Sequence, residues 1–238
     1  MIRRLHVSRI SLGKVELDPA QSHHATRVLR LELNDPVELF DDEGAVAAGV
    51  IVSIEPGVTI RVDELREASK RQHHLTVAAA VPKGDRADWM VEKLSELGVD
   101  LFIPLEAARS VVLPGGKNKI DRWRRLAVES AKQSRRTGVM EIQELAPLKN
   151  ALAHATQQGI AWCLSTQPSA QPIMNLLKEN LPEKLTVFIG PEGGWTDEEL
   201  SQFETAGAKH IGLTASILRI ETAAVTTAAV IQCAIRAS

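Results

Sequence analysis

The sequence has few features of secreted, membrane or disulfide-bonded proteins. Its two cysteines, Cys163 and Cys233, are too few for a disulfide framework, and each lies in an apolar stretch typical of a buried free thiol. No apolar run reaches the ~18 residues that a membrane helix needs. Met1–Ser11 carries three arginines but lacks the apolar core of a signal peptide. We therefore expect a cytoplasmic protein with no membrane partner.

Several common catalytic motifs are also missing. The sequence has no G-x-G-x-x-G after a strand, no G-x-x-x-x-G-K-[ST] and no G-x-S-x-G. The pairs His23-His24 and His73-His74 are adjacent residues, which cannot easily face one zinc ion from regular structure, so we expect no metal site. These absences disfavour hydrolase and dehydrogenase functions.

Charge is nearly balanced overall but unevenly distributed. The net charge is −2, yet residues 117–136 contain eight Lys or Arg against two acids, and residues 1–30 contain six against two. Residues 38–67 have the opposite bias, with eight acids against two Arg. A basic face on such a protein can concentrate phosphates. Solvated helix faces would give the same pattern, so composition leaves both interpretations open.

The 238 residues are enough for two domains, and the pattern changes near residue 70. Short β-branched runs at Val37–Phe40, Val46–Ile54 and Val58–Val62, separated by turns, predict a small barrel over 1–70, preceded by a helix at Pro19–Leu31. The charged segment Asp63–Gln72 is the candidate linker. The second domain is expected over 74–238.

The second domain alternates strands and helices. The strands are predicted at Leu75–Val81, Leu101–Pro104, Ile160–Ser165, Leu185–Ile189 and His210–Leu213. Helical patterns lie between them, including one that ends at Gly98, one around Trp123, and one that begins with a Thr196–Glu199 capping box. This alternation predicts an α/β fold with a mostly parallel sheet. The final helix, Thr222–Ile235, is apolar all round and must be buried, in its own domain or against a partner subunit.

Two loops could carry chemistry. Ile189-Gly190-Pro191-Glu192-Gly193-Gly194 follows a strand, at the edge where open α/β sheets bind ligands, and its glycines permit close backbone approach. A plain strand-to-helix turn is the alternative. The second loop, Thr214–Ala223, brackets Arg219 and Glu221 between apolar residues. These two charges form either an ion pair that caps the last helix or a pair at the mouth of an apolar pocket.

These loops resemble the SPOUT class of S-adenosylmethionine-dependent RNA methyltransferases, and most closely the family that methylates N3 of a uridine in 16S ribosomal RNA. The resemblance covers nearly the whole chain. It is carried by seven motifs in the family's order, which are His23–Arg30, Pro82–Arg86, Glu92–Val99, Arg109-Ser110, Gln133-Ser134 with Arg135 and Arg136, Ile189–Gly194, and Ile217–Arg219 with Glu221–Ala223.

The resemblance implies a PUA-like RNA-binding barrel, a methyltransferase domain with a deep trefoil knot, and a homodimer. The positions that match the family's cofactor site are Leu164, Ile189, Gly190, Gly194, Leu213, Ile217 and Leu218. Thr214 and Ser216 stand where the family is expected to have a glycine and a basic residue, and Lys132 stands where an acid is expected.

The resemblance also implies roles in RNA binding and catalysis. The expected RNA contacts, on the small ribosomal subunit, are Arg3, His24, Arg27 and Arg30 in the barrel, and Lys83, Arg86, Arg109, Arg135 and Arg136 in the catalytic domain. Surface ion pairs are the alternative for each. Arg219 is expected to stabilise the deprotonated base. Glu221 is expected either to accept its proton or to orient Arg219, with Glu192 a second candidate acceptor. A catalytically silent RNA-binding module with the same fold is the competing function.

Overall fold

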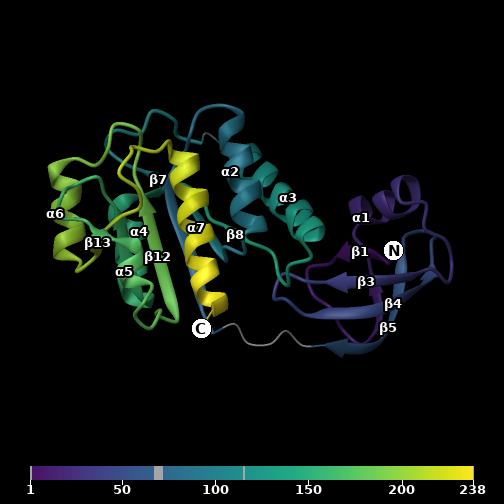
Figure 1. Cartoon of the computed structure of the whole chain (residues 1–238). Helices are drawn as coiled ribbons and strands as arrows, with labels where there is room; N and C mark the ends of the chain where they lie inside the picture. Colours follow the sequence, from purple (N-terminus) through teal and green to yellow (C-terminus); the bar gives the residue numbers. More distant parts are fainter. Residues whose placement is uncertain (1, 67–71, 115, 238) are drawn as a thin grey trace. The chain divides into compact units, whose positions relative to one another are not determined.

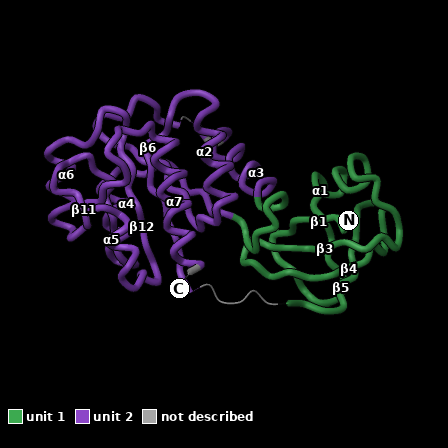
Figure 2. The backbone as a smooth tube through the Cα atoms, viewed as in Figure 1, with its two compact units in different colours: residues 1–71, 131–139 green, residues 72–130, 140–238 purple. Residues whose placement is uncertain are grey.

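The computed structural model describes residues 2–66, 72–114 and 116–237, which form two compact units. Unit 1 comprises Met1–Arg71 with Ala131–Val139, and unit 2 comprises Gln72–Ser130 with Met140–Ser238 (Figure 2). The predicted linker Asp63–Gln72 is wrong in its first part, because the strand Thr59–Arg66 continues through it. Residues 67–71 of that linker lie outside the described residues.

Unit 1 is built on a five-stranded sheet with the order β1-β3-β4-β5-β2 (Figure 1). Its strands are β1 (Arg3–His6), β2 (Gly13–Glu16), β3 (Pro36–Phe40), β4 (Val46–Ser53) and β5 (Thr59–Arg66). Buried and exposed side chains alternate along a strand and fix which face points to the core. In β5, Ile60 and Val62 are buried while Arg61 and Asp63 face solvent. The last three strands were predicted from the sequence; β1 and β2 were not. The predicted helix Pro19–Leu31 is α1 (Pro19–His23) followed by a π-helix, η1 (His24–Val28).

Arg4 joins the segment Ala131–Val139 to the strands of unit 1. Its Nη1 donates to the Ala131 carbonyl at 3.1 Å, its Nε pairs with Glu38 at 2.9 Å, and its guanidinium lies 4.1 Å from the centre of the Phe40 ring. The Arg4 side chain is only 9% exposed. Arg135 and Arg136, expected in the catalytic domain, thus lie in a segment that is part of compact unit 1.

Unit 2 is built on an eight-stranded sheet in which every pairing is parallel. The order is β11-β13-β10-β12-β6-β7-β8, and β9 also pairs with β7. The strands are β6 (His74–Ala80), β7 (Leu101–Glu106), β8 (Glu141–Ile142), β9 (Ala146–Pro147), β10 (Ile160–Leu164), β11 (Gln171–Pro172), β12 (Lys184–Ile189) and β13 (Lys209–Gly212). The predicted α/β class and parallel sheet are confirmed.

Helices cover the sheet of unit 2 (Figure 1). They are α2 (Asp85–Glu96), α3 (Lys117–Ser134), α4 (Leu148–Gln158), α5 (Ile173–Leu176), α6 (Asp197–Thr205) and α7 (Ile220–Ala237). The predicted capping box at Thr196 and Glu199 is present at the start of α6. In the described part of the chain, no helix combines the length and apolarity required to cross a membrane.

The contacts of Arg4 predict a measurable loss of stability when they are removed. Arg4→Ala leaves the Ala131 carbonyl and Glu38 without their partner, and should lower the free energy of unfolding by about 2–4 kcal/mol. Arg61→Ala is the matched control in the same sheet: its ion pair with Asp63 is exposed on both sides, so the loss should stay below about 1 kcal/mol. Urea unfolding followed by circular dichroism measures both. Equal losses would contradict the anchoring role of Arg4.

Candidate functional site

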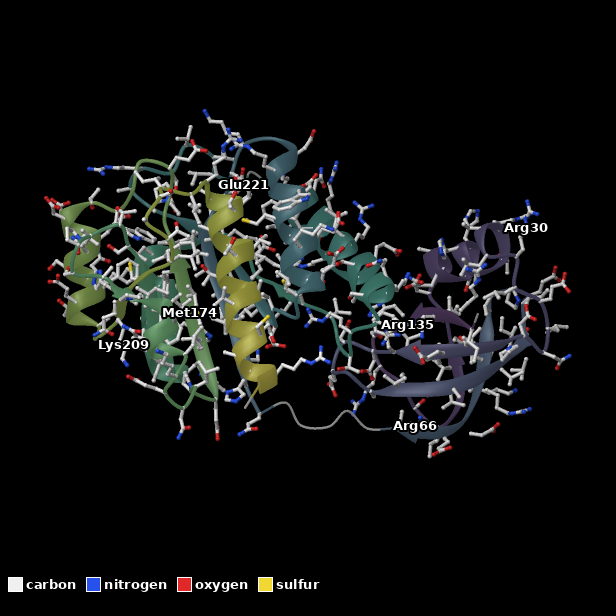
Figure 3. All side chains as sticks on the ribbon, in the orientation of Figure 1. Arg30, Arg66, Arg135, Met174, Lys209 and Glu221 are labelled. Carbon is white, nitrogen blue, oxygen red and sulfur yellow. The ribbon has the colours of Figure 1, made fainter. Side chains whose placement is uncertain are left out.

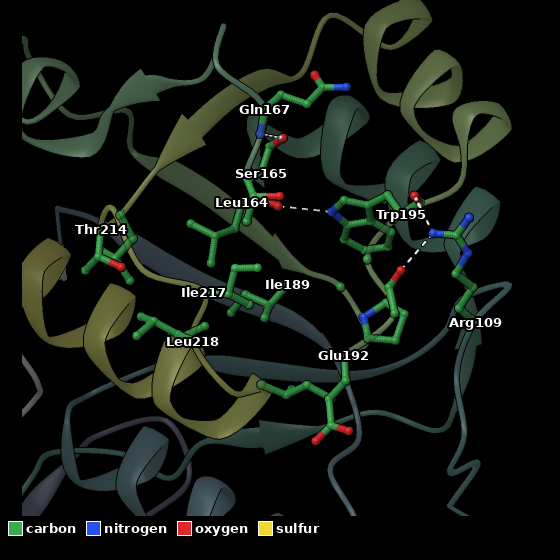
Figure 4. A pocket seen from close by; sticks show the side chains of 18 of the residues that line it. Arg109, Leu164, Ser165, Gln167, Ile189, Glu192, Trp195, Thr214, Ile217 and Leu218 are labelled. Atoms are coloured by element: carbon green, nitrogen blue, oxygen red, sulfur yellow. Dashed lines mark hydrogen bonds between the residues drawn. The ribbon is translucent and has the colours of Figure 1, made fainter.

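Three loops of unit 2 enclose a cavity of about 380 Å³ (Figure 4). They follow β10, β12 and β13, which are neighbouring parallel strands, so their carboxyl ends meet at one edge of the sheet. The lining is mostly apolar or backbone, and Arg109 and Glu192 are its charged members. A cavity of this size suits a ligand as large as a nucleoside cofactor.

Trp195 connects two of these loops. Its indole Nε1 donates to the Leu164 carbonyl at 3.0 Å, which ties the loop after β12 to the end of β10 (Figure 4). A Cβ at Gly190 would lie 2.9 Å from the Trp195 ring, closer than real Cβ atoms come, so a glycine is required there. Gly194 has φ 71° and donates its N–H to Pro191 at 2.8 Å, which closes the turn.

The loop after β13 is closed by its own side chains. The Thr214 hydroxyl donates to the Ser216 carbonyl at 2.7 Å, which supports a tight turn here. Ile217 lines the cavity and is 83% exposed. In Figure 4 its side chain lies beside Ile189 and Leu218. An exposed isoleucine at a cavity mouth is an apolar surface for a ligand to cover.

The structure brings together all of the predicted cofactor residues. The cavity is lined by Leu164, Ile189, Gly190, Gly194, Leu213, Ile217 and Leu218. The cavity is also lined by Trp195 and the segment Ser165–Gln167, which the sequence did not predict as site residues. Trp195 had a visible signal, because a large aromatic residue directly follows two glycines. The loop after β10 had none.

The predicted catalytic residues Arg219, Glu221 and Glu192 have different surroundings. Arg219 is exposed and makes no side-chain hydrogen bond or ion pair with the described residues. Glu221 is 6% exposed, lines neither this cavity nor the smaller one beside it, and pairs with Arg86 at 3.3 Å. The expected positions of Glu221, at a pocket mouth or paired with Arg219, are therefore both wrong. Glu192 lines both cavities.

Two of the predicted RNA contacts in unit 2 instead bind the loop after β12. The Arg109 guanidinium donates to the Gly193 carbonyl at 2.7 Å and to the Trp195 carbonyl at 3.4 Å. Arg86 pairs with both Glu192 and Glu221. Lys83 is exposed at the start of the turn before α2.

The predicted contacts of unit 1 are spread over its surface. Arg3, Arg27, Arg30 and Arg135 are exposed, whereas His24 and Arg136 are partly buried. Arg30 and Arg135 lie well apart in Figure 3.

The basic segment of α3 is largely ion-paired: Lys119 and Arg122 contact Asp88 at 3.6 and 2.6 Å. Lys132 donates to Gln21 at 3.1 Å. The described residues contain no cluster of side chains suited to a metal ion.

Comparison with known proteins identifies the family. An RNA methyltransferase domain model matches residues 69–232, and an RNA methyltransferase PUA domain model matches residues 17–62. The chain belongs to the RNA methyltransferase family. The resemblance found in the sequence is thus confirmed.

The relatives are similar over most of their length. The Ribosomal RNA small subunit methyltransferase E of Synechocystis sp. is 32% identical over 217 residues, which cover 88% of this chain and 69% of that protein. The enzyme of the same name from Neisseria gonorrhoeae, solved with S-adenosyl methionine, is 26% identical with a TM-score of 0.84, and 98% of each chain is covered. A Legionella pneumophila protein, also solved with this cofactor, is 25% identical with a TM-score of 0.84, again over 98% of each chain.

The glycine-rich loop predicts a ligand-specific effect. Gly194→Val forces a β-branched residue to φ 71° at the cavity, and should abolish binding of S-adenosylmethionine in calorimetric titration. Gly207→Val is a matched control, because Gly207 has the same φ of 71°, and no atom lies within 4 Å of a Cβ at either position. Gly207 ends α6 and does not line the cavity. Both variants should lose on the order of 1–2 kcal/mol of stability, but Gly207→Val should keep its affinity. Unchanged affinity in Gly194→Val would remove the loop from the site.

Proposed function

We propose that this chain methylates N3 of a uridine in 16S ribosomal RNA of the small subunit, with S-adenosylmethionine as the methyl donor. The observation that carries the proposal is the cavity at the ends of β10, β12 and β13 in a chain that belongs to the RNA methyltransferase family. The relatives named above act on the small subunit or were solved with this cofactor.

The residues of the cavity fit this cofactor. Adenine requires an apolar slot with backbone donors and acceptors, and Ile189, Leu218 and the glycine-rich loop supply both. A sulfonium is positively charged, and Glu192 is the carboxylate in the lining. When bound, S-adenosylmethionine supplies a methyl group on sulfur, which is already a good electrophile.

The protein's chemical task is to make uridine N3 nucleophilic. That nitrogen carries a proton, and its lone pair is delocalised into two carbonyls, so the site must favour the deprotonated base and align it. Arg219 follows the cavity residue Leu218 and has no partner in the described part of the chain, so its charge is available to the developing anion. Glu192, which reaches both cavities, is the better-placed proton acceptor, and Glu221 supports it indirectly.

RNA recognition is assigned to exposed cations on both units. Arg3, Arg27, Arg30 and Arg135 of unit 1 and Lys83 of unit 2 are free to position the phosphate backbone. His24 and Arg136 are also proposed RNA contacts, although both are partly buried.

The finer architecture is also part of the proposal. The family implies that the five-stranded sheet of unit 1 acts as a PUA-like barrel and that the loops around the cavity form a deep trefoil knot. It also implies a homodimer through α7. The buried face of α7 carries Ala223, Ala224, Thr227 and Ala228, whereas Val225 and Val230 on other sides remain partly exposed. A ribosomal substrate implies a cytoplasmic location.

The competing function, a catalytically silent RNA-binding module, is not favoured by the family's cofactor-bound structures. One assay decides between the two. Purified protein is incubated with labelled S-adenosylmethionine and with small subunits from a strain that lacks this methylation. We expect one methyl group per subunit at N3 of one uridine. Binding of S-adenosylhomocysteine without transfer to any ribosomal RNA or subunit would establish the silent module instead.

Removal of the free cation at position 219 should impair chemistry without impairing cofactor binding. Arg219→Ala should lower kcat by ~10²-fold or more, the scale of one preorganised electrostatic group. Activity should recover partly at high pH, because more of the substrate uridine is already ionised. Lys149→Ala, an exposed cation on α4, is the control and should remain fully active. Full activity of Arg219→Ala, or a loss that only follows unfolding, would refute this role.

The dimer can be tested on α7. Light scattering should give the mass of two chains at micromolar concentration, and Val225→Glu should shift it towards one chain because a charge cannot be buried without a partner. Met174→Glu, which alters a residue of α5 that is already 58% exposed, should leave the mass unchanged. A monomer mass for the unaltered protein would contradict the dimer.

A further inference from the structure

Arg86 connects two carboxylates that come from distant parts of the sequence. It lies in the first turn of α2, Glu192 lies in the loop after β12, and Glu221 lies in the first turn of α7. Nη1 of Arg86 is 3.4 Å from Oε1 of Glu192 and 3.3 Å from Oε1 of Glu221. One guanidinium therefore holds the cofactor loop to the start of the last helix.

The three side chains become more exposed from one end of this bridge to the other. Glu221 is 8% exposed, Arg86 is 35% exposed and Glu192 is 50% exposed. A buried carboxylate is costly unless it is compensated, and Arg86 provides a cation while the N-terminus of α7 provides a favourable dipole. The second oxygen of Glu221, Oε2, is buried and has no hydrogen-bond partner among the described residues. Glu221 thus depends on Arg86 for its compensation.

Glu192 is the residue of this bridge that lines a cavity. It lines the cofactor cavity, and it also lines a smaller cavity bounded by Lys83, Val111 and Ile220. The two cavities share Pro191, Glu192 and Ile220. Glu192 therefore borders both cavities, and Arg86 contacts its carboxylate there.

We infer that Arg86 is a positioning residue that orients Glu192 toward the substrate base and is itself anchored by the buried Glu221. This inference rests on the proposed function and replaces the role of Arg86 as a phosphate contact. A phosphate bound by Nη1 would compete with both carboxylates and would leave Glu221 buried without its cation. Lys83 lies three residues earlier, is exposed and does not compensate the buried Glu221. It remains the phosphate contact of this region.

The two roles of Arg86 predict different measurements. As a positioning residue, Arg86→Gln should lower kcat by about 10- to 100-fold, since small misplacements at a reacting centre have effects of this size. Its KM for the subunit and the salt dependence of its RNA binding should stay unchanged. Arg86→Lys should recover part of kcat, because it restores the charge without the planar fork. Lys83→Gln is the comparison, and should weaken RNA binding and reduce the salt slope by about 0.7–0.9.

Two further variants separate the bridge from a general loss of folding. Glu192→Gln changes a half-exposed residue and should lower kcat at least as far as Arg86→Gln, with an unchanged melting temperature. Arg86→Gln combined with Glu221→Gln should be no slower than Arg86→Gln alone, because the two residues act as a unit. Affinity for S-adenosylhomocysteine, measured by calorimetry, should be retained in the Arg86 and Glu221 variants, whose side chains do not line the cofactor cavity.

The unaltered protein is assayed first on the same particles, so that the two proposals fail separately. No transfer by the unaltered protein would refute the methylation itself. With an active unaltered protein, full kcat in Arg86→Gln or Glu192→Gln would overturn the bridge. A change of KM and salt slope alone in Arg86→Gln would also overturn it, and would restore the phosphate contact. The salt-slope measurement needs no turnover, so it tests Arg86 even if the methylation proposal fails.

Discussion

The hydrogen bond from the Trp195 indole to the Leu164 carbonyl is the interaction on which the site depends most. Parallel strands bring the loops after β10 and β12 to one edge, but they do not fix the distance between those loops. The indole does, because it spans the gap and its ring fills the space that Gly190 leaves open. Arg109 holds the other side of the same loop through the Gly193 carbonyl. These two contacts therefore hold the loop after β12 on both sides.

Several arginines are used inside the structure, which explains how a protein of net charge −2 can be rich in arginine without presenting a uniformly basic surface. Arg4, Arg86 and Arg109 are all used to join segments of their own unit, through carbonyl or carboxylate oxygens. The planar guanidinium suits such bridges because it presents several donors in fixed directions. These three arginines therefore contribute to the internal structure of their units.

Local patterns predicted much of the fold. Apolar runs such as Leu185–Ile189 became central strands, and the Thr196–Glu199 capping box begins α6 as expected. The short strands β1 and β2 were missed because four residues with two or more charged or polar side chains, as in Arg3–His6, do not show a clear alternation. The segment Ala131–Val139 could not have been assigned to unit 1, since its contacts with that unit join residues far apart in the sequence, such as Arg4 and the Ala131 carbonyl 127 residues away.

The candidate site shows the same division between local and distant information. Every apolar or glycine position expected at the cofactor cavity lines it, because strand ends and glycine-rich turns are local features. The charged positions were less predictable. Arg219 and Glu221 lie two residues apart and suggested a pair, but Arg219 precedes α7 and only Glu221 lies in its first turn. Glu221 meets Arg86, 135 residues earlier, and such a partner cannot be found from spacing alone.

Close packing of α7 is what allows this distant pairing. Ala78 belongs to the core on the α4 face of the sheet, so Ala79 points to the opposite face, where α7 crosses β6. Ala79 and the α7 residues Ala224 and Ala228 are all fully buried. Small side chains on both surfaces let the helix approach the strand closely, and this brings its first turn within reach of α2. Larger residues would increase that separation and draw Glu221 away from Arg86. The alanine-rich composition of the last helix therefore serves the geometry of the site as well as the core.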